Sequence, residues 1–169
     1  METQVHSQQA QAHSASGRAL GYILGTVNIP AHVLRLSDKL ADEFYSAAED
    51  TEFSGDQIET YEIPAWASRG AAQWLPDLTV LGYRRADGGY PGREELLVAT
   101  AGADMHTDGE GLVLMVMLHN DGLTFRQGKV RHKPKAGDWF VFDDRRPHGV
   151  SEAPGRSSFL AWNIPIVAL

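Results

Sequence analysis

The stretch MHTDGEG, from Met105 to Gly111, places a histidine and an aspartate two residues apart. An imidazole nitrogen and a carboxylate oxygen are common ligands of divalent metal ions. A further histidine, His148, follows a polar turn later in the chain. The 169 residues contain no cysteine, so a disulfide, a thiolate metal site and a cysteine nucleophile are excluded. Any metal would therefore be held by histidine and carboxylate.

The chain contains a second H-x-D triplet, His119-Asn120-Asp121, so the pattern alone is a weak signal. Asp121 precedes Gly122 at the best hairpin-turn signal in the chain, and a turn already accounts for it. His106 and Asp108 instead end one β-type run and open a glycine-rich loop, which can aim two side chains into a cavity. We interpret the other histidines as tail, structural or surface residues: His6, His13, His32, His119 and His132.

The part of the chain around His148 strengthens this interpretation. The apolar run DWFVF leads through a polar turn to His148, and Arg156 and Ser158 follow after eight and ten residues. Two histidines and one carboxylate on three corners of an octahedron leave three adjacent positions open, which suits iron(II) with a chelating cosubstrate and O2. The far carboxylate of a 2-oxo acid would need a forked cation such as Arg156. If this segment is a strand, Arg156 and Ser158 share a face.

The order H-x-D, distal histidine, R-x-S resembles that of the iron(II)- and 2-oxoglutarate-dependent dioxygenases, which are built on a double-stranded β-helix. The resemblance covers residues 95–166 and includes the GDWFVF run before the distal histidine. It implies that His106, Asp108 and His148 bind iron(II), and that Arg156 and Ser158 hold the C5 carboxylate of 2-oxoglutarate. The implied reaction uses O2 to hydroxylate an unactivated C–H bond, with release of succinate and CO2.

The elements that must position these residues are mainly strands. Apolar residues recur at a helical period near residues 37–49, where Ser37 could act as an N-cap, and we expect one amphipathic helix. Residues 51–78 show an irregular pattern. Short strands at regular spacing predict a sandwich or barrel. The expected fold class is therefore mainly β with a flanking helix, a jelly-roll or cupin-like double-stranded β-helix. The expected strands are 79–83, 95–100, 112–118, 123–127, 138–142 and 158–166.

The composition predicts one globular domain. Residues 1–17 are rich in Gln, Ser, Ala and His, and we expect a disordered N-terminal tail followed by a single domain over residues 18–169. Hydrophobic residues make up 43% and charged residues 22%, which is ordinary for a soluble protein. No run approaches the roughly 18 apolar residues of a membrane span, and the N-terminus lacks an apolar signal region. We expect no membrane partner and a cytoplasmic location.

The net charge of −7 argues against a nucleic-acid-binding surface. We favour a small-molecule substrate, an amino acid or another small polar metabolite, with a nucleobase or a peptide residue as alternatives. Two other functions stay open. One is a cupin-like metalloenzyme that does not use 2-oxoglutarate, although cupins usually present H-x-H and a glutamate. The other is a jelly-roll binding module without catalytic activity.

Overall fold

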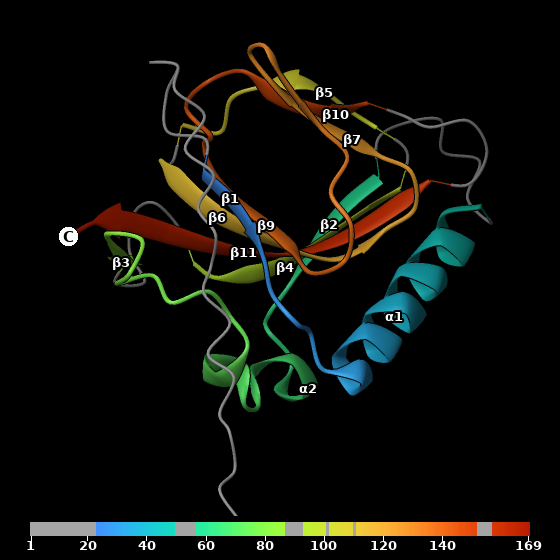
Figure 1. Ribbon diagram of the computed structural model, residues 1–169. Helices are drawn as coiled ribbons and strands as arrows, with labels where there is room; N and C mark the ends of the chain where they lie inside the picture. The colour runs from blue at the N-terminus through green and yellow to red at the C-terminus, as the bar shows by residue number, and fades with distance from the viewer. Residues whose placement is uncertain (1–22, 50–56, 87–92, 101, 110, 152–156) are drawn as a thin grey trace, which may run out of the picture.

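The computed structural model describes residues 23–49, 57–86, 93–100, 102–109, 111–151 and 157–169. The expected tail, residues 1–17, lies outside these ranges. Along the described residues strands dominate and one long helix precedes most of them (Figure 1). The elements are β1 (Ile23–Thr26), α1 (Ala31–Glu49), β2 (Gln57–Tyr61), α2 (Ala65–Ser68), a 3-10 turn η1 (Ala71–Gln73), β3 (Tyr83–Arg85), β4 (Glu95–Thr100), β5 (Ala103–His106), β6 (Leu112–Asn120), β7 (Thr124–Gln127), β8 (Val130–His132), β9 (Asp138–Asp143), β10 (His148–Ser151) and β11 (Ser158–Ala168).

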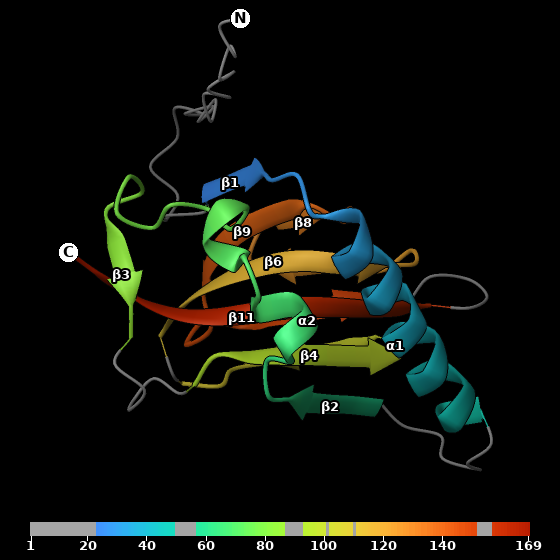
Figure 2. The ribbon, with the colours of Figure 1, turned by 90° about the horizontal axis from the view of Figure 1, so that it is seen from below.

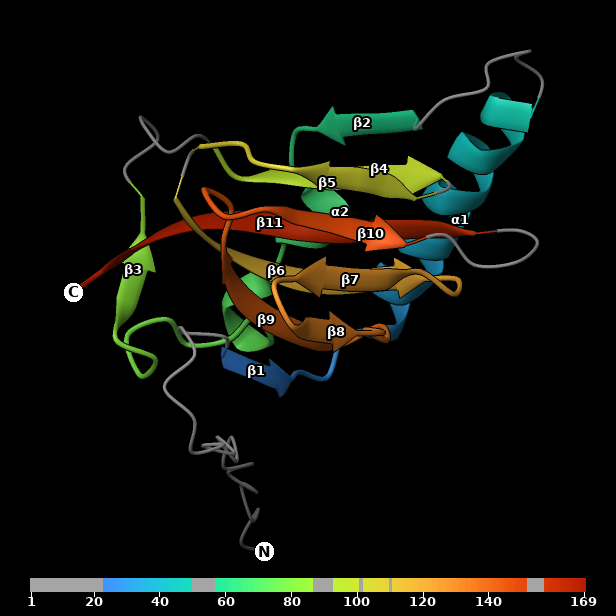
Figure 3. The same cartoon turned by 90° about the horizontal axis from the view of Figure 1, so that it is seen from above.

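The strands form two antiparallel sheets that face each other. The large sheet has the order β1-β9-β6-β11-β4-β2, with β3 added beside β11, and the small sheet has the order β5-β10-β7-β8. From β4 onwards the chain alternates between the sheets, since β4, β6, β9 and β11 belong to the large sheet and β5, β7, β8 and β10 to the small one (Figures 1 and 3). This alternation is the double-stranded β-helix, and it confirms the expected mainly β fold class.

Two apolar layers hold the fold together. Leu114, Val116, Leu160 and Trp162 point to one face of the large sheet, where α1 and α2 pack (Figure 2). Neighbouring residues such as Met115 point to the other face and pack against the small sheet. Because side chains alternate along a strand, β6 and β11 contribute to both layers. The central strands of the large sheet are thus buried on both faces.

Helix α1 begins earlier than the sequence pattern predicts. Its first residue is Ala31, and the carbonyl of Pro30 accepts hydrogen bonds from the amides of Val33 and Leu34 at 2.9 and 3.1 Å. Pro30 directly precedes the helix, where its missing N–H leaves no helical hydrogen bond unmade. Ser37 therefore lies inside the helix rather than at its N-cap, and it is buried against the sheet.

The expected strand over residues 79–83 is also wrong in most of its length, because turns cover Thr79–Gly82 and β3 begins only at Tyr83. Asp77 Oδ1 accepts hydrogen bonds from the amide and the hydroxyl of Thr79, at 3.0 and 2.6 Å. Such an aspartate turn competes with strand formation. Among the described residues, no helix has both the length and the apolar character needed to cross a membrane.

Candidate metal centre

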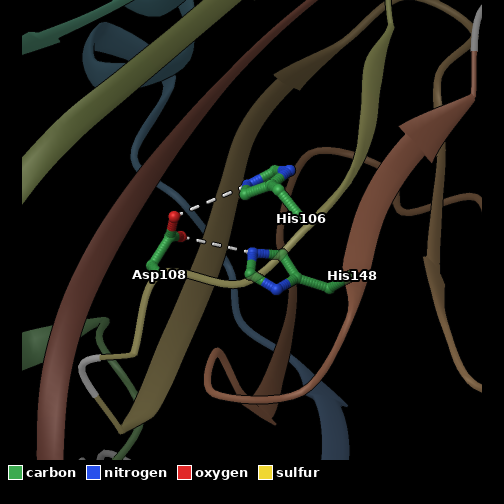
Figure 4. Close-up of side chains that lie close together, drawn as sticks. All are labelled: His106, Asp108 and His148. Atoms are coloured by element: carbon green, nitrogen blue, oxygen red, sulfur yellow. Dashed lines mark ion pairs between the residues drawn. The ribbon is translucent and has the colours of Figure 1, made fainter.

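His106 and His148 stand opposite each other in the small sheet. His106 is the last residue of β5, His148 is the first residue of β10, and the two are direct partners in the antiparallel register. Their ring centroids lie 4.5 Å apart with an interplanar angle of 53°. Residues 42 positions apart in the numbering are therefore brought together by one strand pair (Figure 4).

Each imidazole is oriented by a backbone carbonyl. Nδ1 of His106 lies 2.6 Å from the carbonyl oxygen of Asp104, and Nδ1 of His148 lies 3.0 Å from that of Arg146. A carbonyl oxygen can only accept, so Nδ1 carries the proton in both rings. Each Nε2 is then unprotonated in the neutral ring and can ligate a metal, as metal-binding histidines usually do.

Asp108 completes the cluster from the loop after β5. Its Oδ1 lies 3.7 Å from Nε2 of His106 and its Oδ2 lies 3.4 Å from Nε2 of His148. Figure 4 shows both rings turned toward the carboxylate. The sequence-predicted ligands His106, Asp108 and His148 thus lie together, each offering one ligand atom, with all three atoms within 4.8 Å of one another.

This donor set fits a divalent metal ion. Donors bound at about 2.1 Å lie about 3 Å apart when their bonds meet at a right angle, and the two separations of Asp108 from the imidazoles, 3.7 and 3.4 Å, are close to this value. Small side-chain movements would therefore close the site around one ion. The side chain of His148 is 8% exposed, whereas those of His106 and Asp108 are 43% and 50% exposed. The cluster is consequently open on one side, as a catalytic metal site must be.

The loop that carries Asp108 is fastened to Asp144, which lies in the polar turn before His148. The carbonyl of Asp144 accepts from the amide of Asp108 at 3.1 Å, and its own amide donates to the carbonyl of Gly111 at 2.9 Å. The amide of Gly111 donates to the Asp144 carboxylate. Asp144 is 3% exposed, and Gly111 adopts a φ of 140°, which favours glycine. Asp144 therefore fixes both ends of the segment that presents Asp108.

Gly149, next to His148, lets β10 approach β5 closely. A Cβ at this position would lie 2.8 Å from the carbonyl oxygen of Ala103 and 3.0 Å from that of Asp104. The Asp104 carbonyl is the group that orients His106. A side chain at position 149 would therefore disturb the orientation of His106.

The cluster opens into a cavity of about 390 Å³ between the two sheets. Most of its walls are apolar, and they include Leu97, Val113, Met115, Phe142 and Phe159. A larger hollow of about 620 Å³ lies on the helix-covered side of the large sheet, lined in part by Trp162 and Glu94, and contains none of the three ligands. The smaller cavity is therefore the candidate site, because His106, Asp108 and His148 line it.

Of the two residues expected to bind the cosubstrate, the structure describes only Ser158. Arg156 lies outside the described residues. Ser158 is fully buried on the helix-facing side of β11, and its Oγ lies 3.2 Å from Nε2 of His119. It does not line the cavity. The alternation argument assumed that the strand includes Arg156, but β11 begins at Ser158, and the face that Ser158 shares with Leu160 is the helix-facing one.

Asp38, His119 and Ser158 form a hydrogen-bonded chain, because Nδ1 of His119 also lies 2.8 Å from Oδ1 of Asp38. A hydrolytic triad would need an accessible serine and a buried aspartate. Here the serine is fully buried and the aspartate side chain is 62% exposed. These hydrogen bonds therefore have a structural role, because they connect α1 to the large sheet.

Sequence reasoning also missed the polar residues that line the cavity beside the ligands: Arg93, Glu95, Asp144 and Asn163. Glu95 and Asn163 begin and interrupt apolar strands. The only available signal was a polar residue inside an otherwise apolar run, which does not reveal which face it occupies.

No protein-family model matches the sequence, and no curated protein matches it. Solved structures do. A prolyl 4-hydroxylase from Pseudomonas putida is 21% identical, with 86% of this chain and 92% of that chain covered and a TM-score of 0.52. SnoN, a non-haem α-ketoglutarate-dependent epimerase from nogalamycin biosynthesis, is 15% identical over 88% and 78% of the two chains, with a TM-score of 0.54.

A third similar structure is a prolyl hydroxylase from Trichoplax adhaerens in complex with an oxygen degradation domain peptide of hypoxia inducible factor. It is 15% identical, with 85% of this chain and 83% of that chain covered and a TM-score of 0.52. These likenesses extend over most of each chain at low identity. They show that the chain shares the fold of these oxygenases, the double-stranded β-helix.

Proposed function

We propose that this protein is an iron(II)- and 2-oxoglutarate-dependent dioxygenase that hydroxylates an unactivated C–H bond of a small molecule and releases succinate and CO2. The observation that supports it most strongly is the convergence of His106, Asp108 and His148 at the cavity between the sheets. Two imidazoles and one carboxylate are the donor set of non-haem iron(II) oxygenases. Iron(II) with its cosubstrate and O2 would supply oxidative chemistry that side chains cannot provide.

In this proposal the three ligands have distinct tasks. His106 and His148 bind through Nε2 as neutral imidazoles, because their Nδ1 protons are engaged by carbonyl oxygens. Asp108 contributes one negative charge and is held in place through its amide by Asp144. Since all three approach from the small sheet and its adjoining loop, the cavity side of the ion is left for cosubstrate, O2 and substrate.

The aromatic residues around His148 would exclude water from the reaction. The ring centroids of Phe142 and Phe125 lie 5.0 and 6.3 Å from that of His148. Both residues line the cavity. An oxidising site benefits from such walls, because water and reactive side chains would otherwise consume the oxidant.

The contact with the far carboxylate of 2-oxoglutarate is assigned to Arg156, because its spacing from His148 resembles that of the R-x-S motif in these dioxygenases. Ser158, the second residue of that motif, has its hydroxyl on the helix-facing side and would reach the cosubstrate only after a rearrangement of β11. Anaerobic titration of single variants with 2-oxoglutarate can show which of the two residues contacts the cosubstrate. Arg156→Ala should weaken cosubstrate binding while iron stays bound, and unchanged affinity would remove Arg156 from the site.

Titration with iron(II) under argon tests the proposal itself. Wild-type protein should bind about one iron(II) per chain, and addition of 2-oxoglutarate should produce a weak visible charge-transfer band. His148→Ala should abolish both, whereas His32→Ala, which changes an exposed histidine of α1, should leave both intact. Wild-type protein that binds no iron(II) would refute the proposal.

One observation favours a second candidate, a cupin-like metalloenzyme that does not use 2-oxoglutarate. Among the described residues lining the cavity, Arg93 is the one arginine or lysine, and it pairs with Glu62 at 3.5 Å. Iron binding without any 2-oxoglutarate-dependent band or succinate would indicate this candidate. A binding module without catalysis would show neither metal nor succinate. Elemental analysis together with a succinate assay therefore distinguishes the three functions.

A cytoplasmic location remains a prediction from the composition.

A further inference from the structure

Two polar residues of the cavity take no part in the metal cluster. Glu95 is the first residue of β4 and Asn163 lies in β11, and the two are direct partners in the antiparallel register. Both line the cavity. Directly opposed residues on neighbouring strands have Cβ atoms about 5 Å apart, so their polar groups can act on one bound group.

Asn163 presents an unsatisfied acceptor. Four buried side-chain atoms in the described part of the chain lack a hydrogen-bond partner, and Oδ1 of Asn163 is one of them. Of the four residues that carry these atoms, only Asn163 lines the cavity. A buried amide oxygen without a donor is unfavourable, and such a group in a native fold calls for a missing partner.

Glu95 presents a second acceptor whose charge is poorly compensated. Burial raises the pKa of its carboxyl, and the negative charge of Asp108 acts in the same direction. A hydrogen bond from Thr60 and the charge of Arg93 oppose this shift without cancelling it. Arg93 is itself paired with Glu62 at 3.5 Å. A cation in the cavity would stabilise the ionised form of Glu95.

We propose that Glu95 and Asn163 bind a protonated amino group of the substrate, so that the substrate is a small aliphatic amine. An ammonium group has three N–H donors, which suit a carboxylate and an amide oxygen together. The neighbouring walls, formed by Leu97, Val113 and Met115, would contact the aliphatic part. This inference rests on the proposed function, because it names the class of substrate that would bind in the same cavity.

Three probes that share a five-carbon chain and differ in the polar group test the inference: n-pentylamine, 1-pentanol and pentanoate. Saturation-transfer NMR on the metal-free protein measures their binding without any turnover. The amine should bind more tightly than the alcohol, whereas any binding of pentanoate, at the guanidinium of Arg156, should be unaffected by Glu95→Gln. In protein loaded with Mn(II), the proton relaxation of the amine should be enhanced, because the probe would lie near the paramagnetic ion.

Glu95→Gln keeps the size of the side chain and removes its charge, and it should weaken amine binding by about tenfold or more. Asn163→Leu should weaken it by a smaller factor. Glu59→Gln, at an exposed position of neighbouring strand β2, is the matched control and should bind the amine like wild type. Thermal unfolding and Mn(II) affinity of each variant verify that the fold and the metal centre persist.

Equal binding of amine and alcohol, or wild-type amine affinity in Glu95→Gln, would overturn the inference. Loss of 2-oxoglutarate binding in Asn163→Leu with amine binding intact would overturn it as well, because Asn163 would then serve the cosubstrate. If the protein bound amine but no metal, the proposed function would fail and the amine subsite would stand. If the protein bound metal and 2-oxoglutarate but showed no preference for the amine, the amine subsite would fail and the proposed function would stand.

Discussion

Replacement of Asp144 by alanine probes how the candidate metal ligand Asp108 is held. The backbone hydrogen bonds of residue 144 to Asp108 and Gly111 can persist, whereas the carboxylate that accepts from the Gly111 amide is lost. A buried N–H left without its charged acceptor costs about 2 kcal/mol in the free energy of unfolding. For a domain of this size, that loss corresponds to a melting temperature lower by roughly 4–8 °C.

The same substitution should weaken metal binding more than stability alone explains. Groups that orient a ligand from outside the coordination sphere typically change metal affinity by roughly 10- to 100-fold when they are removed. We expect a loss in this range for Asp144→Ala, measured by Co(II) or iron(II) titration of protein that is still folded. Asp144→Asn keeps an acceptor for the Gly111 amide and should recover most of the affinity.

Asp143→Ala is the matched control, because its carboxylate pairs with the exposed guanidinium of Arg145 at 2.8 Å. An ion pair of this kind contributes about 1 kcal/mol or less, so stability and metal affinity should change little. The reasoning would be refuted if Asp144→Ala matched wild type in both measurements. It would also be refuted if the metal affinity of Asp144→Asn were as low as that of Asp144→Ala in protein of equal stability.

Three further predictions follow from contacts near the site. Gly149→Ala places a Cβ 2.8 Å from the carbonyl oxygen of Ala103, so it should lower the free energy of unfolding by about 1–3 kcal/mol and weaken metal binding; wild-type values in denaturation and titration would contradict this. Burial lowers the pKa of His132 below its usual 6.5. Its unfolded form therefore binds the proton more readily, and the contribution of His132 to stability is full above about pH 6.5 and is lost as the pH falls through the folded-state pKa. Chemical denaturation across pH 5–8 should show this slope in wild type and a shallower one in His132→Gln. Ser158→Ala removes the hydroxyl beside His119, so it should cost about 1 kcal/mol and leave 2-oxoglutarate affinity unchanged, and a marked loss of that affinity would restore Ser158 to the cosubstrate site.

The sequence indicated the buried strands better than the edge strands. Long apolar runs predicted β6, β9 and β11, since a strand buried on both faces is almost continuously apolar. Strands β1 and β2 went unnoticed. They are short, they lie at the two ends of the large sheet, and their residues Leu24 and Ile58 are exposed, so no apolar pattern marks them. Edge strands depend on pairing with a neighbour rather than on their own side chains.

That the three side chains of the candidate metal centre would lie together could be predicted because their signal is chemical. His106, Asp108 and His148 stood out by residue type and because they lie where β-type runs meet loops or turns. The register of β5 and β10 brings the two histidines together, and Asp108 joins them from the loop after β5. Asp144 carried no such signal. Its function depends on a hydrogen bond to Gly111, 33 residues away in the chain, and an aspartate in a polar turn has an ordinary local explanation.

Ser158 shows why the expected cosubstrate contacts were harder to predict than the candidate metal ligands. Alternation along β11 states that residues two apart share a face, but it does not state which face is the cavity. In a sheet with one face exposed to solvent, the polar side chains show which face of the strand is the exposed one. Here Trp162 packs under the helices and Phe159 packs between the sheets, so both faces of β11 are apolar and the pattern is symmetrical. The helices break the symmetry, because α1 and α2 cover the face that carries Leu160 and Trp162. On that face Ser158 contacts His119, which in turn contacts Asp38 of α1. Asn163, five residues further along the same strand, consequently faces the cavity, and it is there that the structure offers a polar group to a ligand.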